Sequence, residues 1–106
     1  MNNEKVTIVA GTTPTLIYRF RTISPQDIKT AYLTVQQGGR VIVKKDMATA
    51  EIGASTLSWT LTQADTLAIS RGEARVMVNW VTLTGMRGTS PEITVYGAKN
   101  HIEKVI

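Results

Sequence analysis

The chain carries few of the residue types that serve in catalysis or metal binding. It has a single histidine, His101, and no cysteine among its 106 residues, so a Cys–His nucleophile pair and a thiolate metal site are both excluded. His101 has no second histidine at metal-ligand spacing, and a lone histidine near a chain end is most often a surface residue. We therefore expect no bound metal and no cofactor.

Paired carboxylates and serine nucleophiles are the remaining routes to catalysis. Asp46 with Glu51, or Asp65 with Glu73, could supply the acid and base of glycoside hydrolysis, but nothing in the sequence brings either pair together. Asp65 is better explained as the partner of a helix N-cap. No serine lies in a G-x-S-x-G context. We predict that the chain is not an enzyme and has no catalytic residues.

Charge and length restrict the functional classes that remain. Twelve Lys and Arg against 8 Asp and Glu give a net charge of +4, and the basic residues are spread along the chain. Such a pattern is typical of a solvated surface, so we expect no nucleic-acid partner. No apolar stretch is long enough to span a membrane, and residues 1–5 do not resemble a signal peptide. Residues 1–106 are predicted to form a single domain.

Alternation of apolar and polar residues predicts strands throughout the chain. The expected strands are 5–9, 15–21, 30–37, 40–45, 57–61, 74–80 and 89–96. Gly38-Gly39 is a two-residue hairpin signal, because both central positions of the favoured turn need a positive φ. No segment has helical periodicity over three turns. These short strands, separated by turn residues, indicate an all-β sandwich.

One stretch, residues 57–80, predicts a corner between strands. Its alternation stops at Thr62, which we interpret as the N-cap of a helical turn with Asp65 as its reciprocal partner. Leu67 and Ile69 are expected to pack this turn onto the core. The predicted core residues share the inward positions of their strands: Leu16, Tyr18, Phe20, Leu33, Val35, Leu57, Trp59, Leu61, Val76, Val78 and Trp80.

Four segments in order resemble a known group of proteins. They are Gly11-Thr12-Thr13-Pro14-Thr15, residues 31–39 (AYLTVQQGG), residues 60–67 (TLTQADTL), and Val76–Trp80 followed by a Gly85–Ser90 hairpin and Ile93. The pattern resembles small structural proteins of phages and prophages of Gram-positive bacteria, and the immunoglobulin-like N-terminal domain of phage baseplate upper proteins. The resemblance implies an all-β, immunoglobulin-like antiparallel β-sandwich of about seven strands with one short helical turn. It transfers no functional residue.

The resemblance also implies a role. It points to a non-enzymatic structural or adaptor module of the virion tail or baseplate, synthesised in the host bacterial cytoplasm. Its partners would be other tail or baseplate proteins, or copies of itself. The alternative is a sandwich that binds carbohydrate or a cell surface. Genes for tail proteins beside its own would favour the first role, and genes for glycan use the second.

Strand edges and the chain end are the expected contact sites. We predict free sheet edges at residues 5–9 and at the strand after Pro91, where backbone groups can extend a partner's sheet. Ile102, Val105 and Ile106 are apolar residues near the chain end, where few neighbours can cover them. These three residues are the predicted partner-binding positions.

Overall fold

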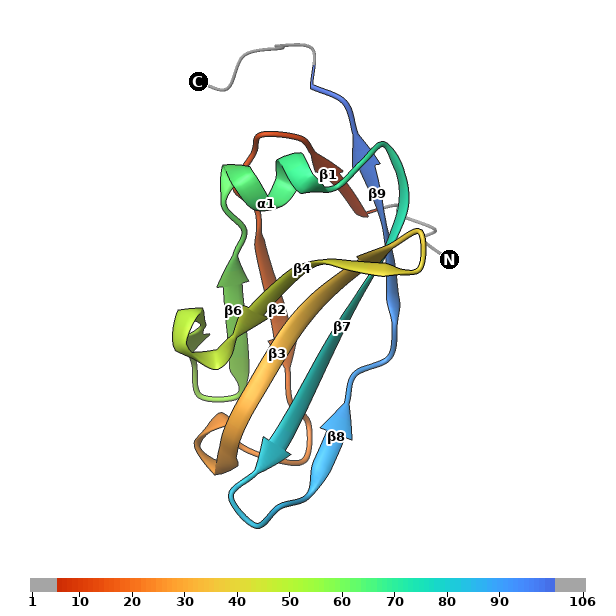
Figure 1. Cartoon of the computed structure of the whole chain (residues 1–106). Coiled ribbons are helices and arrows are strands. Elements are labelled where there is room, and N and C mark those ends of the chain that lie inside the picture. Colours follow the sequence, from red (N-terminus) through yellow and green to blue (C-terminus); the bar gives the residue numbers. More distant parts are fainter. Residues whose placement is uncertain (1–5, 101–106) are drawn as a thin grey trace, which may run out of the picture.

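The computed structural model describes residues 6–100, which fold into two packed β-sheets with nine strands in this part of the chain (Figure 1). The larger sheet contains β1 (Val6–Val9), β9 (Ile93–Ala98), β7 (Gly72–Thr82), β3 (Ile28–Gln37), β4 (Arg40–Asp46) and β8 (Arg87–Thr89). The smaller sheet contains β2 (Thr15–Arg19), β6 (Thr56–Thr60) and β5 (Glu51–Ile52). The connections include two 3₁₀ helices, η1 (Pro25–Asp27) and η2 (Met47–Thr49), and one α-helix, α1 (Gln63–Ala68).

The strand order is that of an immunoglobulin-like sandwich. The larger sheet runs β1-β9-β7-β3-β4, with β8 paired to β7, and the smaller runs β2-β6-β5. In an immunoglobulin domain a further strand flanks the counterpart of β2, and residues 6–100 contain no such strand. The predicted all-β sandwich with one helical turn is confirmed. The strand count exceeds seven because it includes two very short strands, β5 and β8. The one departure from antiparallel pairing among the described strands is β1, which pairs with β9 in parallel.

The core lies between the sheets and follows the predicted alternation. Most predicted core residues are buried: Phe20, Leu33, Val35, Leu57, Trp59, Leu61, Val76 and Val78. Leu16, Tyr18 and Trp80 also pack against this core, as predicted, but they are only partly buried. Leu16 and Tyr18 lie on β2, whose outer side no described strand covers. Trp80 lies over Gly88 on β8, where a Cβ atom would meet the indole ring at 2.5 Å.

The corner before β7 has the predicted capping box. The Thr62 hydroxyl accepts from the Asp65 amide at 3.1 Å, and the Asp65 carboxylate accepts from the Thr62 amide at 2.8 Å. Ile69 is buried, but Leu67 is half exposed, so the expectation that both pack inward is wrong for Leu67. In a single helical turn only positions three or four apart share a face, and here that face carries Thr66 and Ile69. No helix in residues 6–100 is long and apolar enough to cross a membrane.

The hairpin between β3 and β4 has the predicted turn. Gly38 and Gly39 both have positive φ, 60° and 78°, as the two-residue turn requires. The prediction for sheet edges is only half right. β1 is an edge strand, but β9 lies between β1 and β7 along Val95–Ala98. The smaller sheet instead exposes an edge at β2.

Candidate functional site

Three of the four carboxylates considered for acid–base chemistry make structural contacts. Asp46 accepts from the Ala48 amide at 3.1 Å and caps η2. Asp65 belongs to the capping box, and Glu73 pairs with Arg75 at 3.3 Å. Glu51 is exposed on β5. Within residues 6–100, no group of three or more His, Cys, Asp or Glu is placed to hold a metal ion. His101 lies outside the described residues.

Both tryptophans, Tyr18 and Phe20 pack into the sandwich rather than forming an exposed platform. Trp59 is 1% exposed, and its indole nitrogen donates to the Asp46 carbonyl at 2.9 Å. Trp80 packs against Tyr18 and Phe20, with ring centroids 5.6 and 5.0 Å away. The prediction that both tryptophans face the core is confirmed, with Trp80 nearer the surface.

The feature that remains is the outer edge of β2. Antiparallel strands alternate between pairs that exchange backbone hydrogen bonds and pairs that do not. The Leu61 amide donates to the Pro14 carbonyl and the Phe20 amide to the Ser55 carbonyl, both at 2.8 Å, which places Leu16 and Tyr18 in the bonded pairs with β6. The amides and carbonyls of Thr15, Ile17 and Arg19 therefore point away from β6. No described strand pairs with them. β2 thus presents the backbone amides and carbonyls of these three residues to a further strand.

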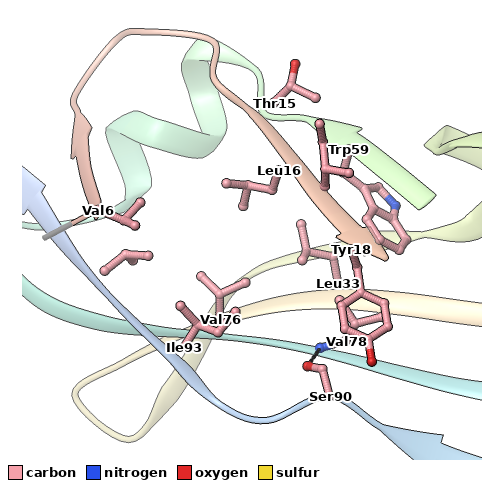
Figure 2. A pocket seen from close by; sticks show the side chains of 12 residues that line it. Val6, Thr15, Leu16, Tyr18, Leu33, Trp59, Val76, Val78, Ser90 and Ile93 are labelled. Atoms are coloured by element: carbon pink, nitrogen blue, oxygen red, sulfur yellow. Dashed lines mark hydrogen bonds between the residues drawn. The ribbon is translucent and has the colours of Figure 1, made fainter. Parts of the chain in front are cut away.

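An apolar cavity opens beside this edge. It has a volume of about 260 Å³ and lies between β2 and the larger sheet. Figure 2 shows its lining, with Leu16 and Tyr18 on β2 directed toward Val76, Val78 and Ile93 of the opposite sheet. Its rim is apolar as well, because Val6 and Ile93 are 47% and 50% exposed. We name the β2 edge together with this cavity the open edge.

Ile17 marks the same place on the outer face of β2. Its side chain is 66% exposed, among the highest values for a large apolar residue in the described part of the chain. Single exposed apolar side chains are ordinary on protein surfaces. Ile17, Val6 and Ile93 differ in that all three border the same cavity, next to the unpaired edge of β2.

The far end of the open edge is basic. Arg19 and Arg21 are both exposed and line a second hollow of about 590 Å³, together with Tyr18, Phe20 and Trp80. Arg19 donates to the Ser55 hydroxyl at 3.3 Å, and neither arginine pairs with a carboxylate within residues 6–100. The open edge therefore runs from apolar to cationic along β2.

Two other basic residues of the sandwich, Arg75 and Lys45, are paired with carboxylates. Arg75 bonds to Glu92 at 2.9 Å and to Glu73 at 3.3 Å, and the bond with Glu92 is the main reason that the pKa of Arg75 is raised. Lys45 pairs with Asp65 at 2.6 Å. Burial raises the pKa of Asp65, but hydrogen bonds from Lys45 and Thr62 and the charge of Lys45 outweigh it and leave that pKa lowered. Arg19 and Arg21 form no ion pair within residues 6–100, and they are set apart by lying beside the same hollow at the end of the open edge.

The predicted contact residues were Ile102, Val105 and Ile106, and all three lie outside the described residues. Sequence reasoning missed the open edge. The one available signal was Ile17, an apolar residue on the polar face of a strand, between Tyr18 and Leu16 and close to two arginines. No family model matches the chain, and no curated protein matches it in sequence.

Proposed function

We propose that this protein is a non-enzymatic structural or adaptor module of a phage or prophage virion, acting in the tail or baseplate through contacts with other proteins. The observation that carries the proposal is the open edge, where an unpaired strand, exposed apolar side chains and unpaired arginines lie together. Such a surface suits a protein partner, because a partner strand can satisfy the backbone groups while its side chains cover the apolar rim. The virion assignment rests on the sequence resemblance.

The alternative role, binding of carbohydrate or a cell surface, has less support. Sugar recognition commonly uses an exposed aromatic face. Tyr32 has an exposed ring on the outer face of β3, but Lys44 already lies over that ring, 4.6 Å from its centroid. Trp59 and Trp80 pack against the core.

Co-expression with the products of neighbouring genes tests the proposed role. The tagged full chain would be expressed with each flanking gene product, purified, and examined by size-exclusion chromatography. We expect a stoichiometric complex with a tail or baseplate protein, and we expect the chain in purified virions by mass spectrometry. Absence from virions and from every such complex would contradict the proposal. Binding on a glycan array in its place would favour the alternative.

A further inference from the structure

We infer that the open edge binds an extended segment of a partner protein as an additional antiparallel strand beside β2, with carboxylates of that segment over Arg19 and Arg21. This inference rests on the proposed function, since it specifies how the module docks. It commits to a partner of stated chemistry: a strand with apolar residues at alternate positions and acidic residues at its N-terminal end.

The backbone pattern selects an extended strand as the occupant. The amides and carbonyls of Thr15, Ile17 and Arg19 point outward at every second residue, which is the spacing at which another strand donates and accepts. A helix has no free backbone groups along its length to match this row. The neighbouring pairs β2–β6 and β6–β5 are both antiparallel, and antiparallel pairing is slightly more stable per residue, so we assign that direction.

The cavity specifies the side chains of that strand. In a strand placed beside β2, residues opposite Leu16 and Tyr18 point inward, into the cavity between the sheets. An apolar cavity of roughly 150 Å³ holds a benzene molecule, and this one has about 260 Å³. It therefore has room for aliphatic side chains at both inward positions. Those side chains would also cover the exposed parts of Val6 and Ile93.

Charge specifies the end of the strand. Arg19 lies on the outward side of β2 with Ile17, and Arg21 follows two residues after the strand. Neither arginine pairs with a carboxylate in residues 6–100. Residues of an antiparallel strand opposite these arginines lie toward its N-terminus. Acidic side chains there would form charge-assisted hydrogen bonds with the guanidinium groups.

A short peptide provides the probe. Acetyl-EVEVTVT-amide places valines at the inward positions and glutamates opposite the two arginines; acetyl-KVKVTVT-amide is its charge-reversed control. Each is titrated into the full-length ¹⁵N-labelled protein to about 1 mM, the weak end of measurable affinity. We expect amide shifts and slowed hydrogen exchange at Thr15, Ile17 and Arg19. We expect little change in exchange at Leu16 and Tyr18, whose amides already bond to β6.

Two proline variants separate strand pairing from general surface effects. Ile17→Pro removes an outward amide without touching the bonds to β6 and should weaken binding at least tenfold, roughly the effect of one or two lost hydrogen bonds. Ile52→Pro is the matched control, because Ile52 is also an exposed isoleucine on an edge strand of the same sheet. The Gly53 amide bonds to Thr56, which leaves the Ile52 amide pointing outward. We expect this variant to bind as the unchanged chain does.

The charge variants and the outcomes complete the test. The double variant Arg19→Gln, Arg21→Gln should bind the acidic peptide severalfold more weakly, whereas Arg40→Gln, on β4, should bind it as the unchanged chain does.

Absence of acidic-peptide binding, equal binding of the lysine peptide, or full binding by Ile17→Pro would overturn the inference. A dimer of the unchanged chain that Ile17→Pro converts to monomer would assign the open edge to a second copy and also overturn it. If a tail protein binds the Ile17→Pro chain at full strength, the docking mode is wrong while the proposed function stands. If the peptide binds but no virion protein does, the proposed function fails alone.

Discussion

The corner at α1 and the open edge at β2 both lie where the two sheets meet, yet they are built in opposite ways. At the corner, the buried Thr66 hydroxyl donates to the Thr12 carbonyl at 2.8 Å and accepts from the Gly11 amide at 3.0 Å. Asp65 bonds to Thr62 and to Lys45. At the open edge, backbone groups of β2 have no described partner and Ile17 is 66% exposed.

This contrast separates stability from recognition. Groups that are buried and fully bonded cost free energy when removed, because their partners are left unsatisfied. Groups at an open edge are already solvated, so removing them changes the folded state little. Variants of the interior and the corner should therefore lower the free energy of unfolding, and variants of the open edge should alter only binding.

Trp59→Ala should have the largest effect. The side chain is buried between the sheets and its indole nitrogen bonds to the Asp46 carbonyl, so truncation leaves a cavity and an orphaned acceptor. We expect a loss of about 3–5 kcal/mol in the free energy of unfolding, measured by urea denaturation. Trp80→Ala should cost less, because Trp80 is only partly buried. Equal losses in the two variants would show that the β2 side of the sandwich is as closed as its centre.

Thr66→Val tests the corner directly. It preserves the shape of the side chain but removes the hydroxyl that serves both Gly11 and Thr12. We expect a loss of about 1–3 kcal/mol by the same measurement, the cost of leaving buried polar groups without a partner. Thr60→Val is the control, because the Thr60 hydroxyl bonds only to the exposed Thr15 hydroxyl. A neutral Thr66→Val would mean that the corner does not depend on this bond.

Asp65→Asn tests whether the corner is sensitive to pH. The folded-state pKa of Asp65 is lowered, so its ionised form stabilises the fold above the unfolded-state pKa near 3.9, and this contribution is lost as pH falls through the folded pKa. We expect the unchanged chain to exceed the variant by about 1 kcal/mol at pH 7, and the difference to shrink below pH 4. Denaturation across pH 3–7 measures it, with Glu51→Gln as the control. A constant difference would contradict the role of the charge.

Ile17→Thr should have the smallest effect on stability. The side chain is mostly exposed and threonine retains strand propensity, so we expect a change within about 0.5 kcal/mol. Binding of the acidic peptide should nevertheless fall, as followed by the same amide shifts. A loss of stability above about 1.5 kcal/mol would mean that Ile17 is covered in the free chain, which would remove the contrast between the two regions.

Much of this fold could be predicted from local patterns. Alternation in residues 57–61 and 74–80 identifies which side chains face inward, because successive residues of a strand point to opposite sides. Thr62 and Asp65 have the spacing of a capping box, and Gly38-Gly39 has the composition of a tight hairpin turn. Each of these signals depends on residues close together in the chain, because a side chain acts on the backbone of its near neighbours.

The candidate site had only one weak signal of this kind, the apolar Ile17 on the polar face of its strand, and only the tertiary structure decided the site. Alternation in β2 shows that Leu16 and Tyr18 point inward, but it does not show that their outer side lacks a neighbouring strand. Strands pair through backbone amides and carbonyls, which almost every residue type carries, so the order of strands leaves little trace in the sequence. For the same reason β9, predicted as an edge, lies beside β1, while β2 is left open. The side chains thus determined which faces are buried, and the packing of the two sheets determined which edge is available to a partner.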